Sequence, residues 1–165
     1  MRVLGVDPGI RGGLALLERG SLVWADDIPI MGVDAKKRVN ASRLHEMLTL
    51  FDPIEHAYIE RAQAFPQQGA SSGFSYGRAV GAIEAAILCC GIPLTIVEPR
   101  MWKKHFGLKG DDKEAARQKA LMLFPSGHRF MTLKQDHGRA EAALIALYGA
   151  PTFLPLQNAR ATSAA

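Results

Sequence analysis

Two acidic residues stand at the ends of predicted β-strands. Asp7 follows the apolar run at residues 3–6 and precedes a Pro-Gly pair, which is typical of a strand that ends in a turn. Glu60 closes a second short strand at residues 56–60. If these strands are neighbours, the two carboxylates lie at one edge of a sheet and repel each other. A hard divalent cation such as Mg²⁺ relieves that repulsion, so the pair indicates a metal site.

A helix predicted over residues 136–148 supplies further candidates. Glu141 lies among alanines and leucines, where a charged side chain needs a partner. It either joins the acidic site, points to solvent or pairs with Arg139. His137 lies four residues earlier, on roughly the same helix face. Asp136 either contributes a ligand or caps the helix through its orphan amides.

Together these groups favour one chemistry. Acids held a few ångströms apart can clamp the metal ions of an in-line phosphodiester hydrolysis. The candidate metal ligands are therefore Asp7, Glu60, Asp136 and Glu141, with His137 as a further catalytic candidate.

The elements that must position these residues alternate along the chain. Strands are predicted at residues 3–6, 12–17, 21–25, 56–60 and 93–97, with a loop at 26–39 and another at 63–73. Helices are predicted at 40–51, capped by Asn40 or Ser42, and at 74–90, 100–106, 112–124 and 136–148. The helix at 74–90 carries small residues that allow close packing. An antiparallel start followed by β-α-β units indicates an α/β fold with a mixed sheet and helices on both faces.

The densest basic stretch runs from residue 100 to residue 119. Phosphates could be neutralised by Lys103, Lys104, Lys109, Lys113 and Arg117. The alternative is a solvated helix face, because Asp111, Asp112 and Glu114 interleave with these cations and can pair with them. The net charge of +4 permits a polyanionic partner without requiring one.

Bulk composition bounds the architecture. The 165 residues are 48% hydrophobic and 22% charged, which predicts one soluble domain over 1–150 followed by a loosely ordered tail over 151–165. No apolar stretch is long enough to span a bilayer. Cys89 and Cys90 lie in an apolar run and are expected to be buried, as in a protein of the reducing cytoplasm.

Four segments in order resemble the RuvC-type Holliday junction resolvases of the RNase H-like superfamily. They are VLGVDPGIRGGLAL, YIERAQAF, IVEPRMWKKHFGLKGDDKEAAR and DHGRAEAALIA, which together cover most of residues 1–150. The compact form looks more like phage or prophage members than the housekeeping bacterial enzyme.

The resemblance implies an RNase H-like fold with a mixed five-stranded sheet. It also implies a homodimer that resolves four-way DNA junctions by paired nicks in strands of like polarity. The cofactor would be Mg²⁺, with Mn²⁺ as a substitute. Lys103 and Lys113 match family lysines near the scissile phosphate. DNA contacts are also expected from Arg61, Gln63, Phe65 and Arg78, with Phe65 as a wedge that stacks on an unpaired base and Arg78 facing DNA or the partner subunit.

One departure from the family pattern leaves alternatives open. The last two metal-site residues usually stand three apart, but Gly138 occupies the position three before Glu141 and cannot ligate. Either Asp136 or His137 must complete the site.

Another RNase H-like nuclease, acting on flaps or RNA–DNA hybrids, remains an alternative, as does a catalytically silent junction binder. The chain is too short for the related two-domain sugar-kinase architecture. Nothing in the residues identifies a helicase partner.

Overall fold

A five-stranded sheet forms the centre of the molecule. The computed structural model describes residues 1–34, 37–62, 69–110 and 112–150. The strands follow the order β3-β2-β1-β6-β7 across the sheet. Their bounds are β1 Arg2–Asp7, β2 Gly13–Glu18, β3 Ser21–Asp27, β6 His56–Glu60 and β7 Leu94–Val97. The short strands β4 (Ile30–Met31) and β5 (Arg38–Val39) pair separately. Among the described residues, no helix is both long and apolar enough to cross a bilayer.

The central strand β1 joins two kinds of pairing. It is antiparallel to β2, which is antiparallel to β3 in turn. On its other side β1 is parallel to β6, and β6 is parallel to β7. The tight connections between β1, β2 and β3 make the antiparallel half, and helical crossovers make the parallel half. The predicted α/β fold with a mixed five-stranded sheet is therefore confirmed.

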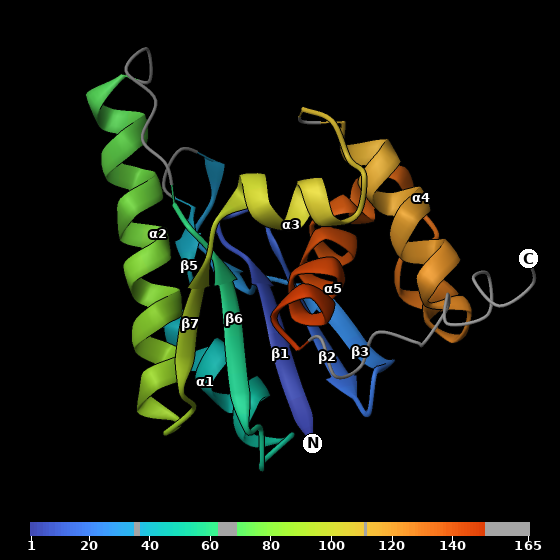
Figure 1. Cartoon of the computed structure of the whole chain (residues 1–165). Helices are drawn as coiled ribbons and strands as arrows, with labels where there is room; N and C mark the ends of the chain where they lie inside the picture. Colours follow the sequence, from blue (N-terminus) through green and yellow to red (C-terminus); the bar gives the residue numbers. More distant parts are fainter. Residues whose placement is uncertain (35–36, 63–68, 111, 151–165) are drawn as a thin grey trace, which may run out of the picture.

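Helices cover both faces of this sheet, as predicted (Figure 1). One face packs against α1 (Ala41–Thr49) and α2 (Ala70–Cys89) through alternate β1 side chains such as Leu4 and Val6. The other face packs against α3 (Pro99–His105), α4 (Lys113–Leu123) and α5 (His137–Gly149). Because successive strand residues point to opposite faces, Val3 of β1 packs in the core on the side of α3, α4 and α5. Two 3₁₀ segments, Pro125–Phe130 and Lys134–Asp136, connect α4 to α5.

Helix α5 lies unusually close to the sheet. A Cβ on Gly5 of β1 would stand 1.9 Å from the carbonyl oxygen of Ala142. A Cβ on Gly13 of β2 would stand 2.4 Å from the amide nitrogen of Arg139. Glycine at both positions lets the helix backbone rest directly on the strand backbones. The N-terminal end of α5 is thereby held over the turn between β1 and β2.

Most predicted elements are confirmed to within a few residues, with two exceptions. The predicted loop at 26–39 contains β4, β5 and the end of β3. Helix α2 begins at Ala70, inside the predicted loop at 63–73. Asn40 does cap α1, because its side chain accepts a hydrogen bond from the amide of Arg43 at 3.0 Å.

The expectation that both cysteines are buried is wrong. Cys89 is exposed and Cys90 is half-buried, because the buried stripe of α2 passes through Ile83, Ala86 and Ile87 instead. The small-residue face of α2 also differs from expectation. Nothing lies within 4 Å of a Cβ placed on Gly77 or Gly81, so the helix face that carries these two glycines packs on no described element.

The contact between α5 and β1 can be tested at Gly5. We expect Gly5→Ala to lower the free energy of unfolding by at least about 2 kcal/mol, because the added methyl group meets backbone and the helix must move away. Chemical denaturation measures the change. Gly73→Ala in α2 is the matched control, since its Cβ would meet nothing within 4 Å and should have little effect or stabilise the helix. Equal losses in both variants would contradict the close-packing argument.

Candidate active site

Asp7 and Glu60 meet at one edge of the sheet. Asp7 ends β1 and Glu60 ends β6, and these parallel strands pair in register up to Val6 and Ile59. The next residue on each strand therefore stands beside its counterpart. Alternation along the strands places both carboxylates on the face covered by α3 and α5. The condition on which the expected acidic pair depended, that the two strands are neighbours, is met.

Glu141 joins them from α5. Its side chain is only 9% exposed, so it does not point to solvent. The negative charges of Glu141 and Glu60, together with burial as the largest cause, raise the pKa of Asp7 well above its usual value. Lys113 and Lys103 oppose that shift. Three carboxylates and two lysines thus share one electrostatic environment.

Arg139 is engaged elsewhere. Its Nε donates to Oδ1 of Asp27 at 2.7 Å, and its guanidinium lies 3.7 Å from Asp26. These contacts tie the first turn of α5 to the end of β3. With the Phe130 carbonyl and Asp136 as its further partners, Arg139 gives no support to the alternative in which it pairs with Glu141.

Trp102 holds Glu60 in place. The indole is fully buried, and its Nε1–H donates to Oε2 of Glu60 at 2.6 Å. The ammonium of Lys103 lies 5.6 Å from the centre of the same indole ring. Helix α3 therefore positions two groups of the site through adjacent residues: Trp102 holds the Glu60 carboxylate, and Lys103 supplies an ammonium group. Sequence reasoning missed this hydrogen bond, because an apolar aromatic residue gives no sign of which polar group its N–H will meet.

Asp136 immediately precedes α5, where one of the two predicted roles placed it. Its Oδ2 accepts a hydrogen bond from the backbone amide of Leu133 at 2.8 Å, which closes the preceding 3₁₀ turn. Its Oδ1 faces the guanidinium of Arg139 at 3.9 Å. The side chain makes no cap hydrogen bond to α5 itself. The carboxylate is thus committed to the turn and to Arg139.

His137 is differently placed. Its Nδ1 is buried and has no hydrogen-bond partner within the described part of the chain. Burial, followed by the positive charge of Lys113, lowers the pKa of this imidazole. The ring is therefore neutral near pH 7, which leaves a nitrogen lone pair available for a cation.

Gly138 explains the departure from the family spacing. A Cβ at this position would lie 2.9 Å from the carbonyl oxygen of Arg11 and from the carbonyl carbon of Gly12. The start of α5 touches the β1–β2 turn at this point, so the position cannot carry a ligating side chain without moving the helix.

The basic candidates divide by location. Lys103 and Lys113 act on Asp7, whereas Lys104 and Lys109 are exposed on and after α3. Arg117 is only 7% exposed. Its guanidinium donates to two oxygens of Glu114 and to the carbonyl of Met131 at 2.8 Å. Its placement as a phosphate contact is not supported, because the interior of the fold uses its hydrogen-bonding capacity.

The remaining DNA-binding candidates flank the loop after β6. Arg61 is exposed and forms an ion pair with Glu98, the residue that follows β7. Gln63 and Phe65 lie outside the described residues. Arg78 is exposed on α2.

Tyr76 is a neighbour of the site that sequence reasoning missed. Its ring carbon Cε2 lies 3.5 Å from the Cβ position of Gly9, in the turn after Asp7. Burial and the negative charges of Asp7 and Glu60 raise the pKa of its phenol to about 12. The regular small-residue pattern around it gave no signal, since a lone tyrosine on a helix usually packs in a core.

The donor set fits a hard divalent cation. Among the described residues no three His, Cys, Asp or Glu side chains already form a compact metal-binding group. The carboxylates of Asp7, Glu60 and Glu141 are nevertheless close enough to raise the pKa of Asp7, and a cation would relieve that repulsion. The unpartnered Nδ1 of His137 adds a donor at the start of the same helix as Glu141.

Comparison with solved structures identifies the fold. The chain is similar to RuvC of Thermus thermophilus in complex with a Holliday junction substrate, at 24% identity and a TM-score of 0.61 over 91% of this chain and 92% of that one. A second Thermus thermophilus RuvC structure matches at 24% identity and a TM-score of 0.55, over 91% and 93% of the two chains. The fold is therefore the RNase H-like fold of RuvC, as the resemblance implied.

A sequence relative points in the same direction. The chain is 29% identical over 101 residues to the chloroplastic Holliday junction resolvase MOC1 of Chlamydomonas reinhardtii. That match covers 61% of this chain but only 12% of the relative's length. No protein-family model matches the chain.

The hydrogen bond from Trp102 can be tested without DNA. We expect Trp102→Phe to weaken Mg²⁺ affinity roughly tenfold, because groups that orient a ligating carboxylate carry effects of that size. The measurement is the rise in melting temperature with increasing Mg²⁺. Trp24→Phe is the matched control, since Trp24 stacks on Phe51 away from the acids. Equal Mg²⁺ responses in the two variants would show that Trp102 only fills space.

Proposed function

We propose that this chain is a metal-dependent endonuclease that resolves four-way DNA junctions by paired nicks in strands of like polarity. The observation that carries the proposal is the convergence of Asp7, Glu60 and Glu141 with Lys103 and Lys113 at one edge of the sheet. The RuvC fold and the relative named as a Holliday junction resolvase support a junction as the substrate.

The acidic groups would hold the metal. Asp7, Glu60 and Glu141 supply carboxylate oxygens, and His137 completes the set better than Asp136, whose carboxylate is bonded to Leu133 and faces Arg139. The expected ion is Mg²⁺, with Mn²⁺ able to substitute. When bound, the ion supplies Lewis acidity and a lowered pKa for water at the scissile phosphate.

The chain's own residues prepare the remaining chemistry. Lys103, placed by α3, and Lys113, at the start of α4, offer ammonium groups to the non-bridging phosphate oxygens. Trp102 fixes Glu60 so that this carboxylate faces the shared site. The exposed Lys104 and Lys109 extend the positive surface along the DNA backbone and would contribute affinity without sequence selection. The proposal also includes DNA contacts from Arg61 and Gln63 and stacking of Phe65 on an unpaired base.

A homodimer would supply the second active site that paired nicking needs. Helix α2 exposes one face on which Phe74 is 71% and Leu88 57% solvent-accessible. Gly77 and Gly81 lie on the same face with open space beside them. Small residues flanked by large apolar ones allow two helices to approach closely and bury the apolar side chains.

A cleavage assay tests the proposed activity. The purified chain is incubated with a labelled four-way junction, a matched linear duplex, a flap and an RNA–DNA hybrid, in Mg²⁺ or EDTA. We expect symmetric nicks in the junction alone, dependent on Mg²⁺. Asp7→Asn should reduce the rate by more than about a hundredfold. Glu46→Gln, which alters only an exposed ion pair on α1, is the control. Tight junction binding without cleavage would favour a silent binder, and preferential cutting of flaps or hybrids would change the substrate.

The same Asp7→Asn variant has a second expected effect. The pKa of Asp7 is raised in the folded chain, so the native state favours the protonated form. The associated stability is present at low pH and is lost as pH rises through the raised value. In EDTA near pH 7, Asp7→Asn should therefore melt above the wild type, by about 3 °C for each kcal/mol of relieved repulsion. That difference should shrink at pH 4. A variant that melts lower at pH 7 would contradict the electrostatic account.

The dimer can be tested on α2. We expect Gly81→Arg to convert the dimer to a monomer in analytical ultracentrifugation, because a charged side chain would fill the space between two apolar faces. Paired nicking should become independent single nicking. Thr49→Arg on the exposed end of α1 is the control. A wild type that is monomeric with or without junction DNA would refute the proposed dimer.

A further inference from the structure

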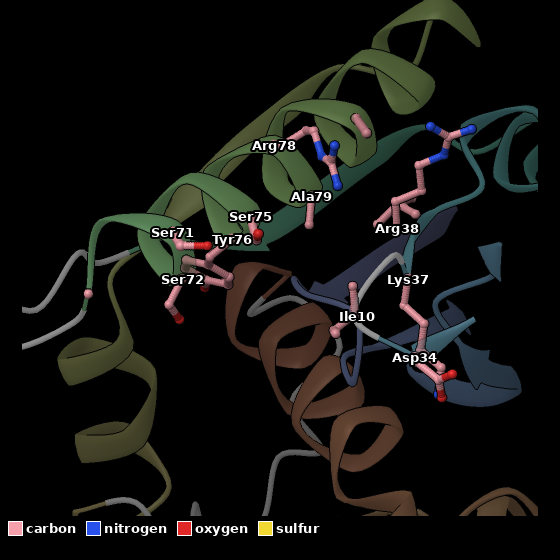
Figure 2. A pocket seen from close by; sticks show the side chains of 13 residues that line it. Ile10, Asp34, Lys37, Arg38, Ser71, Ser72, Ser75, Tyr76, Arg78 and Ala79 are labelled. Atoms are coloured by element: carbon pink, nitrogen blue, oxygen red, sulfur yellow. The ribbon is translucent and has the colours of Figure 1, made fainter. Parts of the chain in front are cut away.

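A pocket of about 730 Å³ lies beside the acidic site. It is bounded by the first half of α2, by Ile10 in the β1–β2 turn and by four residues near β5, namely Asp34, Lys37, Arg38 and Val39. Figure 2 shows Arg78 and Ser75 on α2 facing Ile10, Lys37 and Arg38 across an open space. Its volume is that of a typical small-ligand site.

The lining combines apolar and cationic groups. Side chains of Ile10, Val39, Ala79 and Ala82 give it an apolar surface. Lys37, Arg38 and Arg78 surround that surface, with Asp34 as the opposing charge. Within the described part of the chain, none of these three cations has a recorded ion pair. The hydroxyls of Ser71 and Ser75 add hydrogen-bonding groups. This chemistry suits a ligand with a flat apolar body and an anionic group.

Tyr76 connects the pocket to the carboxylates. Its side chain lines the pocket and approaches Gly9, which follows Asp7 by two residues. The negative charges of Asp7 and Glu60 also act on its phenol. Tyr76 is therefore a residue shared by the pocket and the surroundings of the acidic site. This face of α2 lies roughly a third of a turn from the face proposed for the dimer, so both can be used together.

We propose that this pocket receives one unpaired nucleotide of the DNA strand whose phosphodiester lies at the carboxylates. The inference rests on the proposed function. The base would lie on the apolar surface and against Tyr76, and Lys37, Arg38 and Arg78 would contact its phosphates. A four-way junction can release a nucleotide at its crossover more cheaply than a continuous duplex. The pocket would thus favour junctions over linear DNA.

Photocrosslinking tests the placement. Junctions carrying a single 5-iodo-2′-deoxyuridine at each nucleotide around the crossover are irradiated with the full chain in Ca²⁺, a hard cation that also binds carboxylate oxygens. We expect one position next to the cut to crosslink to Tyr76 or its α2 peptide, and no equivalent crosslink from the linear duplex. Ser75→Trp should fill the pocket, remove the crosslink and weaken junction binding about tenfold, with duplex binding unchanged. Ser126→Trp, exposed on the 3₁₀ segment after α4, is the control.

A charge variant provides an independent measurement. Arg78→Gln should weaken junction binding and reduce its salt dependence by about one phosphate contact. Arg19→Gln, in the turn between β2 and β3, is its control. Crosslinks outside the pocket, or junction affinity unchanged by both Ser75→Trp and Arg78→Gln, would overturn the inference while junction cleavage leaves the proposed function standing. A wild type that neither prefers nor cuts junctions would instead overturn both.

Discussion

The close contact between α5 and the β1–β2 hairpin is the constraint on which the site depends. Gly5, Gly13 and Gly138 remove the side chains that would otherwise separate helix from sheet. The helix backbone then rests on the strands, and Glu141 approaches the end of β1. A layer of ordinary side chains in this interface would move Glu141 outward, away from Asp7. The acidic site is therefore a consequence of backbone packing as much as of the acidic residues themselves.

This packing concentrates charge that the fold must tolerate. Burial disfavours the ionised carboxylate of Asp7, and its acidic neighbours add to that penalty. The two large apolar cores on either side of the sheet offset the cost, so the chain can fold around an electrostatically unfavourable centre. Hydrogen bonding from Trp102 fixes one acid, and Lys103 on the same helix partly compensates the charge. Functional sites commonly carry such local penalties.

Periodicity and turn residues were sufficient to predict most strands and helices and to place Asp7 and Glu60 at strand ends, whereas the pairing of those two strands, on which their meeting depends, came from the structure. Spacing alone could not show that Lys113 and Arg117, which lie four residues apart on one helix, have different roles. The first acts on Asp7, whereas the second turns inward to Glu114 and the Met131 carbonyl. Burial of a long cation depends on tertiary contacts that spacing does not encode. The same limit applies to Tyr76, to the Trp102 hydrogen bond and to the exposed Cys89.

The charge balance of the site bears on its chemistry. Asp7, Glu60 and Glu141 supply three carboxylates against two ammonium groups, from Lys103 and Lys113, and the ammonium of Lys113 is on an exposed side chain whereas Glu141 is buried. His137 adds no positive charge near neutral pH, because burial and Lys113 lower its pKa. An anionic phosphodiester entering such a site would meet net repulsion from ionised acids. A divalent cation reverses the sign at the point where the carboxylates converge, so the groups that repel DNA without metal attract it with metal. Metal and substrate binding should therefore be coupled, with the lysines setting the orientation of the phosphate and the cation determining whether it can enter.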